Sequence, residues 1–199
     1  MRSEPDTRTR LLEAAIAVIE TRGEPAIRIR EISETAGVSY ASLYHFFGDR
    51  ASLIEEAQVE RFRVSLYSFI PELAVAVEGC RTKREFRKLA KSALERLFAP
   101  DRAEHRWRRA NVLGAAETRP TLAVRLEKAL DEYYTALADA LAPAQAKGWV
   151  RRDLDLKVFS TWMLGMVSGR LLIELSPEPG LDNAWDDIAV EAVLAVLIA

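Results

Sequence analysis

Residues 32–47 read ISETAGVSYASLYHFF, and this stretch decides how the first part of the chain folds. Gly37 can take the positive φ that a tight turn between two helices needs, which a residue with a Cβ adopts less readily. Ser39 can accept a hydrogen bond from a free backbone N–H of the next turn, so it predicts the start of a second helix. The stretch therefore predicts a helix-turn-helix, whose second helix can enter the major groove of DNA.

Residues 8–54 resemble the DNA-binding domain of the tetracycline-repressor (TetR) family of transcriptional regulators. The resemblance rests on RLLEAA at 10–15, Gly23, Ile32, AGVS at 36–39, SLYHFF at 42–47, Arg50 and Leu53. Two positions depart from the family pattern: Arg28 stands where a capping threonine is common, and Ala41 stands where glycine is frequent. The remainder of the chain resembles the family only as a generic helical domain, which in this family binds a ligand and dimerises.

Apolar residues recur at helical spacing nearly throughout, so we expect an all-α fold. The pattern predicts helices at 7–22, 28–36, 40–46 and 50–76, then at 82–98, 103–115, 119–142, 155–175 and 182–198. Asp6 or Thr7 should cap the first helix and Asp49 the fourth. Pro71 predicts a kink or break near Phe69, and further breaks are expected at Pro100, Pro120, Pro143 with Gly148, and 177–180.

We expect two domains that share the fourth helix. Residues 1–50 should form an N-terminal three-helix helix-turn-helix DNA-binding domain. Residues 51–199 should form a helical ligand-binding and dimerisation domain.

Composition excludes several other classes of protein. The chain has 199 residues, of which 49% are apolar, so it is not a disordered chain. Cys80, His45 and His105 are scattered, and no motif places a nucleophile, a carboxylate pair or metal ligands together, so we expect no enzyme activity, no metal and no cofactor. The start is polar rather than a signal peptide, and the apolar stretch 188–199 is too short to span a membrane, so we expect a cytoplasmic protein without a membrane partner.

Charge does not favour simple electrostatic binding to DNA. The net charge is −2, and residues 1–63 carry nine basic and eleven acidic side chains. Any DNA affinity must therefore come from the local placement of arginines. Residues 78–109 carry eleven basic and five acidic side chains, which we interpret as a solvated helix face.

The short helix around Ser42 supplies the candidate DNA contacts, because its hydroxyls, rings and imidazole can bond base edges or phosphates. With the flanking arginines, the predicted DNA-binding residues are Arg28, Arg30, Ser39, Tyr40, Ser42, Tyr44, His45 and Arg50. The resemblance implies contacts to DNA from Arg30, Ser42 and Tyr44, and a phosphate contact from Arg50 in place of a family lysine. Two alternatives stay open: Tyr44 packs in the core, or His45 is exposed without touching a base.

The second half carries aromatic and methionine side chains that could line an apolar cavity, although such stripes also fill ordinary cores. The candidate ligand-binding residues are Phe62, Leu66, Trp107, Asn111, Tyr133, Tyr134, Trp162, Met163 and Met166. The last two helices present small and apolar residues that could pair with a second copy, or only close their own domain. The candidate dimer residues are Gly165, Gly169, Trp185, Ala189, Ala192, Val193 and Val196.

These observations predict a homodimeric transcriptional regulator, most simply a repressor, that binds a palindromic operator in double-stranded DNA. A small apolar or amphipathic effector would release it. The alternatives are a helical small-molecule-binding module that does not bind DNA and, with less support, an enzyme with a pocket among the same helices.

Overall fold

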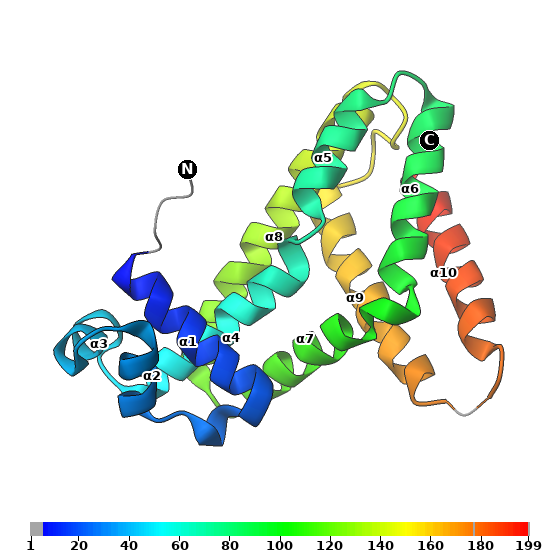
Figure 1. The fold of residues 1–199 in the computed structure, drawn as a ribbon. Coiled ribbons are helices and arrows are strands. Elements are labelled where there is room, and N and C mark those ends of the chain that lie inside the picture. Colours follow the sequence, from blue (N-terminus) through cyan, green and yellow to red (C-terminus); the bar gives the residue numbers. More distant parts are fainter. Residues whose placement is uncertain (1–5, 177, 199) are drawn as a thin grey trace. The chain divides into compact units, whose positions relative to one another are not determined.

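The computed structural model describes residues 6–176 and 178–198, and in this part of the chain the fold is all-α, as predicted (Figure 1). Extended backbone pairing among the described residues is limited to one bridge between Val150 and Ile198. The elements are α1 (Thr7–Arg22), η1 (Glu24–Ala26), α2 (Ile29–Ala36), α3 (Tyr40–Phe47), α4 (Arg50–Tyr67), α5 (Ile70–Gly79), α6 (Lys83–Phe98), η2 (Pro100–Arg102), α7 (Ala103–Ala116), α8 (Pro120–Ala146), α9 (Leu156–Glu174) and α10 (Leu181–Leu197).

Local chemistry sets the ends of the first helices. Asp6 Oδ1 accepts the N–H of Thr9 at 2.8 Å, and Asp49 Oδ1 accepts the N–H of Ser52 at 2.7 Å. Gly37 has φ +65° and ends α2 in the left-handed region, where a side chain would be strained. The predicted caps and the predicted turn are therefore confirmed.

Two prolines behave differently. Pro71 lies in the first turn of α5, and α4 ends at Tyr67, which confirms the predicted break near Phe69. The break predicted at Pro143 with Gly148 does not fall at the proline: α8 continues through Pro143 to Ala146, and Gly148 follows its end with φ +72°. Ala140, Leu141 and Ala144 are buried in the last two turns, and their packing holds the helix despite the backbone hydrogen bond that the proline cannot donate.

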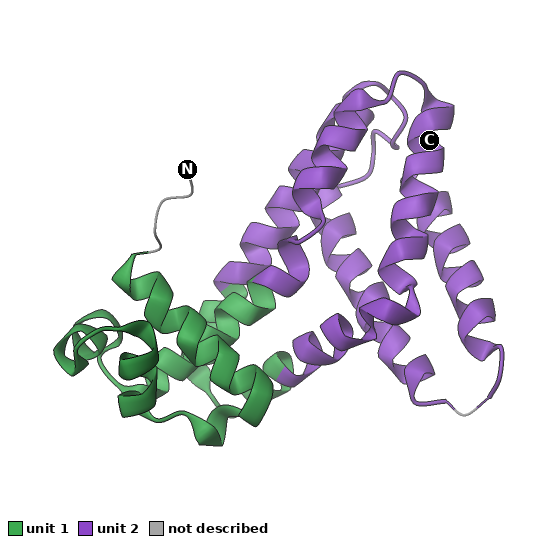
Figure 2. Cartoon of the chain, viewed as in Figure 1, with its two compact units in different colours: residues 1–63, 112–127 green, residues 64–111, 128–199 purple. Residues whose placement is uncertain are grey.

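The chain divides into two compact units (Figure 2). The first comprises residues 1–63 and 112–127, and the second comprises 64–111 and 128–199. The division differs from the domains expected at residue 50, since the first unit extends further along α4 and includes a segment from α7 to α8. The boundaries fall within α4, α7 and α8, so three helices belong in part to each unit.

Each unit has its own apolar core. In the first unit Leu11, Ile32, Leu43 and Leu53 are fully buried, so α1 to α4 enclose one cluster. In the second unit α6, α9 and α10 pack together. Among the described residues α9 alone has the length and apolar composition to cross a membrane, a test that core helices of globular proteins also pass. Here it buries Phe159, Met163 and Val167 against its neighbours.

Candidate DNA interface and ligand cavity

The outer face of α3 presents the polar and aromatic residues that the sequence assigned to DNA. Tyr40 and Tyr44 are 45% and 52% exposed, and Ser39 and His45 are also exposed. Ser42 is half-buried, and its Oγ lies 3.0 Å from Ser39 Oγ. The alternative that Tyr44 packs in the core is therefore wrong.

The inner face of α3 explains why so short a helix is held in place. Leu43 and Phe47 are buried beneath it, and Ser39 Oγ accepts the N–H of Ser42 at 3.1 Å as the N-cap. Phe46, which sequence reasoning left unassigned, is 39% exposed and meets the His45 ring edge-to-face at 5.1 Å. The exposed aromatic surface of α3 is therefore larger than predicted. The sequence signal for it was Phe46 itself, an apolar residue that directly follows the polar residues of the predicted DNA-binding face.

The three predicted arginines lie near the start of α2 and the start of α4. Arg28 makes no side-chain cap, and its Nη1 donates to the carbonyl oxygens of Pro25 at 2.6 Å and Ile27 at 3.0 Å. Arg30 is exposed and donates from Nε to Glu34 at 2.8 Å. Arg50 donates to the carbonyl oxygens of Ile27 and Glu24, so it also braces the connection from η1 to α2.

A bidentate ion pair joins η1 to the start of α8 within the first unit. Arg119 donates from Nη1 to Glu24 Oε1 at 3.0 Å and from Nη2 to Oε2 at 2.7 Å, and Gln58 also donates to Glu24. Burial raises the pKa of Glu24, but the hydrogen bonds from Arg119 and Gln58 outweigh it, and the pKa lies below its ordinary value of 4.5. Glu24 is therefore ionised and held by both partners at neutral pH.

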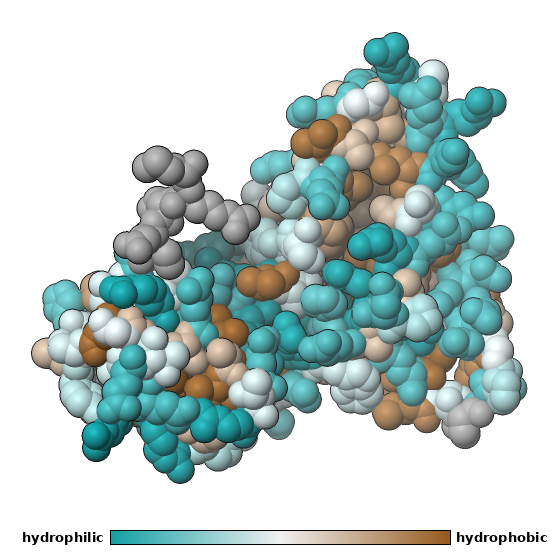
Figure 3. Space-filling model, in the orientation of Figure 1, coloured by the Kyte–Doolittle hydropathy of each residue, from teal (hydrophilic) through white to brown (hydrophobic). Residues whose placement is uncertain are grey.

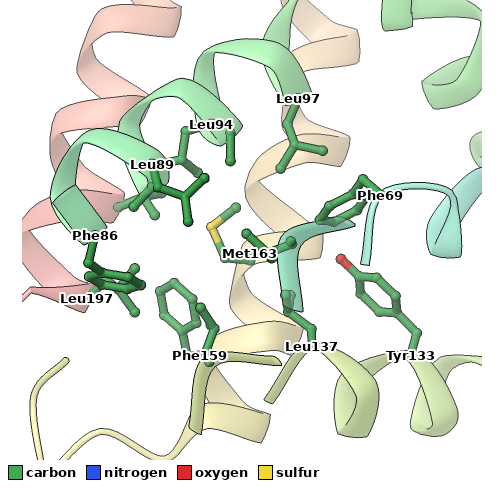
Figure 4. Close-up of a pocket in the computed structure, with 15 residues that line it drawn as sticks. Phe69, Phe86, Leu89, Leu94, Leu97, Tyr133, Leu137, Phe159, Met163 and Leu197 are labelled. Carbon is green, nitrogen blue, oxygen red and sulfur yellow. The ribbon is translucent and has the colours of Figure 1, made fainter. Parts of the chain in front are cut away.

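The second unit contains an apolar cavity of about 50 Å³ among α5, α6, α8, α9 and α10 (Figure 4). Figure 3 shows apolar side chains gathered at the hollow between α5 and α6, with hydrophilic ones around it. The residues that line the cavity are Phe69, Leu73, Phe86, Leu89, Ala90, Ala93, Leu94, Leu97, Tyr133, Leu137, Leu141, Phe159, Met163, Val193 and Leu197. Tyr133 contributes the one hydroxyl, which in Figure 4 points toward Phe69.

Two of the nine predicted ligand-binding residues, Tyr133 and Met163, line this cavity. Leu66 lines a smaller adjoining pocket, and Phe62 is fully buried without lining either one. The other five are absent from both walls: Trp107, Asn111 and Trp162 are exposed, and Tyr134 and Met166 are half-buried. The α6 stripe of Phe86, Ala90, Leu94 and Leu97 was missed, although its helical spacing is visible in the sequence.

The interpretation of residues 78–109 as a solvated face is wrong for two arginines. Arg106 and Arg109 are 1% and 7% exposed, because this side of α7 faces the interior of the second unit. Burial lowers the pKa of Arg109 to about 10, so it stays protonated at neutral pH.

The predicted dimer residues fall on different faces of α9 and α10. Ala189 and Val193 are 1% and 0% exposed within the single chain, so their assignment to a surface between subunits is wrong. Trp185 packs edge-to-face on Phe98 at 5.3 Å, and an added Cβ at Gly169 would lie 3.9 Å from the Trp185 ring. Gly165 is exposed, and Ala192 and Val196 are half-buried.

Residues 11–57 match the family described as bacterial regulatory proteins, tetR family. The HTH-type transcriptional regulator BetI of Rhizobium meliloti is 34% identical over 82 residues, which cover 41% of this chain and 38% of that protein. The chain therefore aligns with well under half the length of this relative.

Solved structures match over nearly the whole chain. A TetR-family regulator from Rhodococcus sp. aligns with a TM-score of 0.66 at 24% identity, covering 96% of this chain and 98% of that one. A regulator from Saccharomonospora viridis in complex with choline aligns at 0.62 and 20% identity, covering 96% and 97%. FadR from Bacillus subtilis in complex with stearoyl-CoA aligns at 0.57 and 16% identity, covering 94% and 98%. The helix-turn-helix segment at residues 11–57 is therefore similar to that of the tetR family of bacterial regulatory proteins, and the chain shares its fold with these solved structures.

Proposed function

We propose that the protein is a transcriptional repressor that binds a palindromic operator as a homodimer and releases it when a small effector binds. The observation that carries this proposal is the outer face of α3, where Tyr40, Tyr44 and His45 are exposed over a buried anchor of Leu43 and Phe47. Such exposed hydroxyls and rings on a short braced helix suit base edges and phosphates in a major groove. The match of residues 11–57 to the tetR family supports the same role.

DNA binding would rest on local contacts rather than on total charge, since the net charge is −2. Arg28, Arg30 and Arg50 flank α3 in the sequence and would meet phosphates, while Ser39, Tyr40, Ser42, Tyr44 and His45 would face the groove. Two copies of α3 in a symmetric dimer would occupy successive major grooves, about 34 Å apart. Two operator half-sites would therefore be related by the same two-fold axis as the subunits.

The outward faces of α9 and α10 are the proposed dimer surface. Ile188 and Leu172 are 70% and 74% exposed, and Trp162 is 38% exposed. Gly165 is exposed on the same helix as Trp162 and would allow a close approach by a second helix. Large apolar side chains left in water on two neighbouring helices favour a self-complementary contact with a second copy.

The effector would occupy the cavity of the second unit. The cavity measures about 50 Å³, well below the roughly 300–1,000 Å³ of most small-molecule sites, so a ligand has to separate its walls. Helix α8 carries Tyr133, Leu137 and Leu141 of the cavity and begins directly after Arg119, which holds Glu24 beside α2. Displacement of α8 by a ligand would therefore disturb the ion pair between Arg119 and Glu24, and with it the helix-turn-helix.

The energy that this switch requires is modest. To lower operator affinity a hundredfold, the effector must prefer the released form by about 2.7 kcal/mol. The choline and stearoyl-CoA complexes of structural neighbours show that this fold accepts ligands of very different chemistry. The chemistry of the effector of this chain must therefore be inferred from the residues of its own cavity. A repressor of this kind acts on chromosomal DNA, and we place it in the cytoplasm.

The test is binding of the full-length protein to palindromic fragments from the DNA upstream of its own gene. Fluorescence anisotropy at several salt concentrations should show a saturable, salt-dependent complex with two subunits per operator. A variant with Tyr40, Tyr44 and His45 all changed to alanine should fold normally and lose the complex. If the wild-type protein binds specific and scrambled fragments equally, the proposal fails and a helical small-molecule-binding module becomes the better description.

A further inference from the structure

A second, polar pocket adjoins the apolar cavity in the second unit. It measures about 20 Å³ and shares Phe69, Leu97 and Tyr133 with the larger cavity. Its polar side includes Arg102, His105 and Arg109, which recur at helical spacing along η2 and α7. Its lining contains no aspartate or glutamate.

Arg109 is the unusual member of this pocket. Its Nη1 donates to the carbonyl oxygen of Ser65 at 3.1 Å, but its Nε is buried and has no hydrogen-bond partner in the described structure. Nδ1 of His105, on the same wall, is also buried without a partner. Burying a guanidinium without a carboxylate is costly, so a protein rarely retains one unless something pairs with it.

The other two buried arginines of this unit show what a satisfied guanidinium looks like here. Arg106, one turn from Arg109, pairs with Glu174 and donates to the carbonyl oxygens of Leu97 at 2.8 Å and Ala99 at 3.1 Å. Arg170 donates from Nε to Asp186 at 2.6 Å. Among these three, Arg109 alone forms no ion pair within the described residues. Glu174 acts on Arg109 through its charge, but its Oε1 binds Arg106 and its Oε2 is buried without a hydrogen-bond partner.

We propose that this polar pocket receives the carboxylate of an amphipathic effector whose apolar body occupies the adjoining cavity. The inference rests on the effector function proposed above and names the chemistry of that effector. One oxygen of the carboxylate would accept a hydrogen bond from the free Nε of Arg109. The second oxygen would face the side of the pocket that Arg102 and His105 line. Guanidinium and carboxylate match in shape and charge, and such pairs are stronger than neutral hydrogen bonds.

The size of the pocket favours a small head group. A volume of about 20 Å³ is close to that of one or two water molecules, which suits a planar carboxylate better than a tetrahedral phosphate ester. The apolar body would lie among Phe86, Phe159 and Met163, where the wall has no charged group. Its way in lies between α5 and α6, where an outer groove shares Phe69, Leu73 and Leu89 with the cavity and includes Arg102.

The test compares three probes of one chain length on the full-length protein: decanoate, 1-decanol and decylamine, each followed by calorimetric titration. Decanoate should bind at least about tenfold more tightly than 1-decanol, because its carboxylate forms a hydrogen bond between charged groups with Arg109 and a neutral hydroxyl does not. Decylamine should bind least. Equal affinities for decanoate and 1-decanol, or no binding of decanoate, would overturn the proposal.

Variants then assign the head group to Arg109. Arg109→Gln should reduce the preference for decanoate over 1-decanol to less than threefold, whereas Arg109→Lys should keep part of it. Arg96→Gln, which removes a charge from the outer groove only, is the matched control and should leave the preference unchanged. If Arg109→Gln does not fold, Arg102→Gln tests the same pocket from a half-buried position and should also reduce the preference.

Thermal unfolding without ligand separates a binding role from a structural one. Because the wild-type protein buries an unpaired charge, Arg109→Gln should unfold at the same temperature or a higher one, and a marked drop would indicate a structural arginine. Operator binding is measured on the same samples without probe. If the wild-type protein binds decanoate but does not bind the operator, the proposal that it is a repressor fails. If it binds the operator but does not prefer decanoate to 1-decanol, the proposal of a carboxylate pocket fails.

Discussion

The guanidinium of Arg50 donates from Nε to the carbonyl oxygen of Ile27 at 3.1 Å, across 23 residues of the chain. Its Nη2 donates to the carbonyl oxygen of Glu24, also at 3.1 Å. Both acceptors lie in the segment that leads from α1 into α2, where Arg28 provides no side-chain cap. Arg50 therefore braces the helix-turn-helix from α4, while its Nη1 makes no hydrogen bond among the described residues and would make the proposed phosphate contact.

Substitution of Arg50 should separate its two roles. Arg50→Ala should lower the free energy of unfolding by about 1–2 kcal/mol through the two lost hydrogen bonds. It should also weaken binding to all DNA sequences alike and flatten the salt dependence by about one unit. Arg50→Lys keeps the positive charge, so it should retain the salt dependence of DNA binding. It loses the planar guanidinium that reaches both carbonyl oxygens, so its free energy of unfolding should still fall. Urea unfolding and binding at several salt concentrations check both, and identical behaviour of the two variants would contradict the double role.

Tyr40 should read bases rather than supply general affinity. It is 45% exposed on α3, so Tyr40→Ala should change the free energy of unfolding by less than about 0.5 kcal/mol. It should change the preference between operator variants by about 1–3 kcal/mol at the affected base pair. Binding to a panel of single-base operator variants measures this, with Thr35→Ala on the exposed side of α2 as control. A uniform loss over the whole panel would show that Tyr40 touches only the backbone.

Helix ends were predictable from the sequence, and cavity walls were not, for a physical reason. Asp6, Gly37, Ser39 and Asp49 act on backbone groups within four residues of themselves, so their effect is local and readable. Which side of an apolar helix faces inward depends on neighbours that are distant in sequence. Within α10, Ile188 is 70% exposed and Ala189 is 1% exposed, although both residues are apolar.

The same limit applies to charge. Arg106 and Arg109 lie in a basic run that has the composition of a solvated surface, and only packing around α7 shows that they are buried. Pro143 failed as a helix stop because the burial of Ala144 and its neighbours outweighs one missing hydrogen bond. Tertiary packing overrode the local signal in each case.

Glu24 should make the stability of the first unit depend on acid pH. Its pKa is lower in the folded state than its ordinary value of 4.5, since the hydrogen bonds from Arg119 and Gln58 outweigh the effect of burial. A depressed carboxyl pKa adds stability above the unfolded pKa and loses it as the pH falls through the folded pKa. Glu24→Gln should therefore be less stable than the wild type at pH 7, and the difference should begin to shrink near pH 4.5 and vanish only once the pH is below the lowered pKa of folded Glu24. Thermal unfolding from pH 7 to pH 3 measures this, with the exposed Glu13→Gln as control; a constant difference would contradict the ion pair.

Arg28 should exchange stability for DNA affinity. It is the N-cap residue of α2 and has the extended backbone of a cap, with φ −127° and ψ 120°, but its side chain caps nothing. Arg28→Thr should supply the missing acceptor, and because the hydrogen bonds lost to Pro25 and Ile27 are short-range and largely exposed, the net stabilisation should be below about 1 kcal/mol. It should also weaken operator binding, because one proposed phosphate contact is lost. Denaturant unfolding and anisotropy on the same variant test both parts, and a variant that is more stable with unchanged DNA affinity would remove Arg28 from the interface.

Ile188 should hold two subunits together without contributing to the fold of one. It is 70% exposed on α10, whereas Val193 on the same helix is buried, so a charge at position 188 should leave the core intact. In a two-fold interface the substituted residue occurs once in each subunit, so two carboxylates would be buried in one apolar contact without water or an opposite charge. Ile188→Asp should therefore be monomeric at micromolar concentration in sedimentation velocity and should bind a full operator much more weakly than the wild type. Val75→Asp, at a 72% exposed position on α5, is the matched control and should remain dimeric. A dimeric Ile188→Asp would move the interface away from the outer face of α10, and a monomeric wild type would remove the dimer altogether.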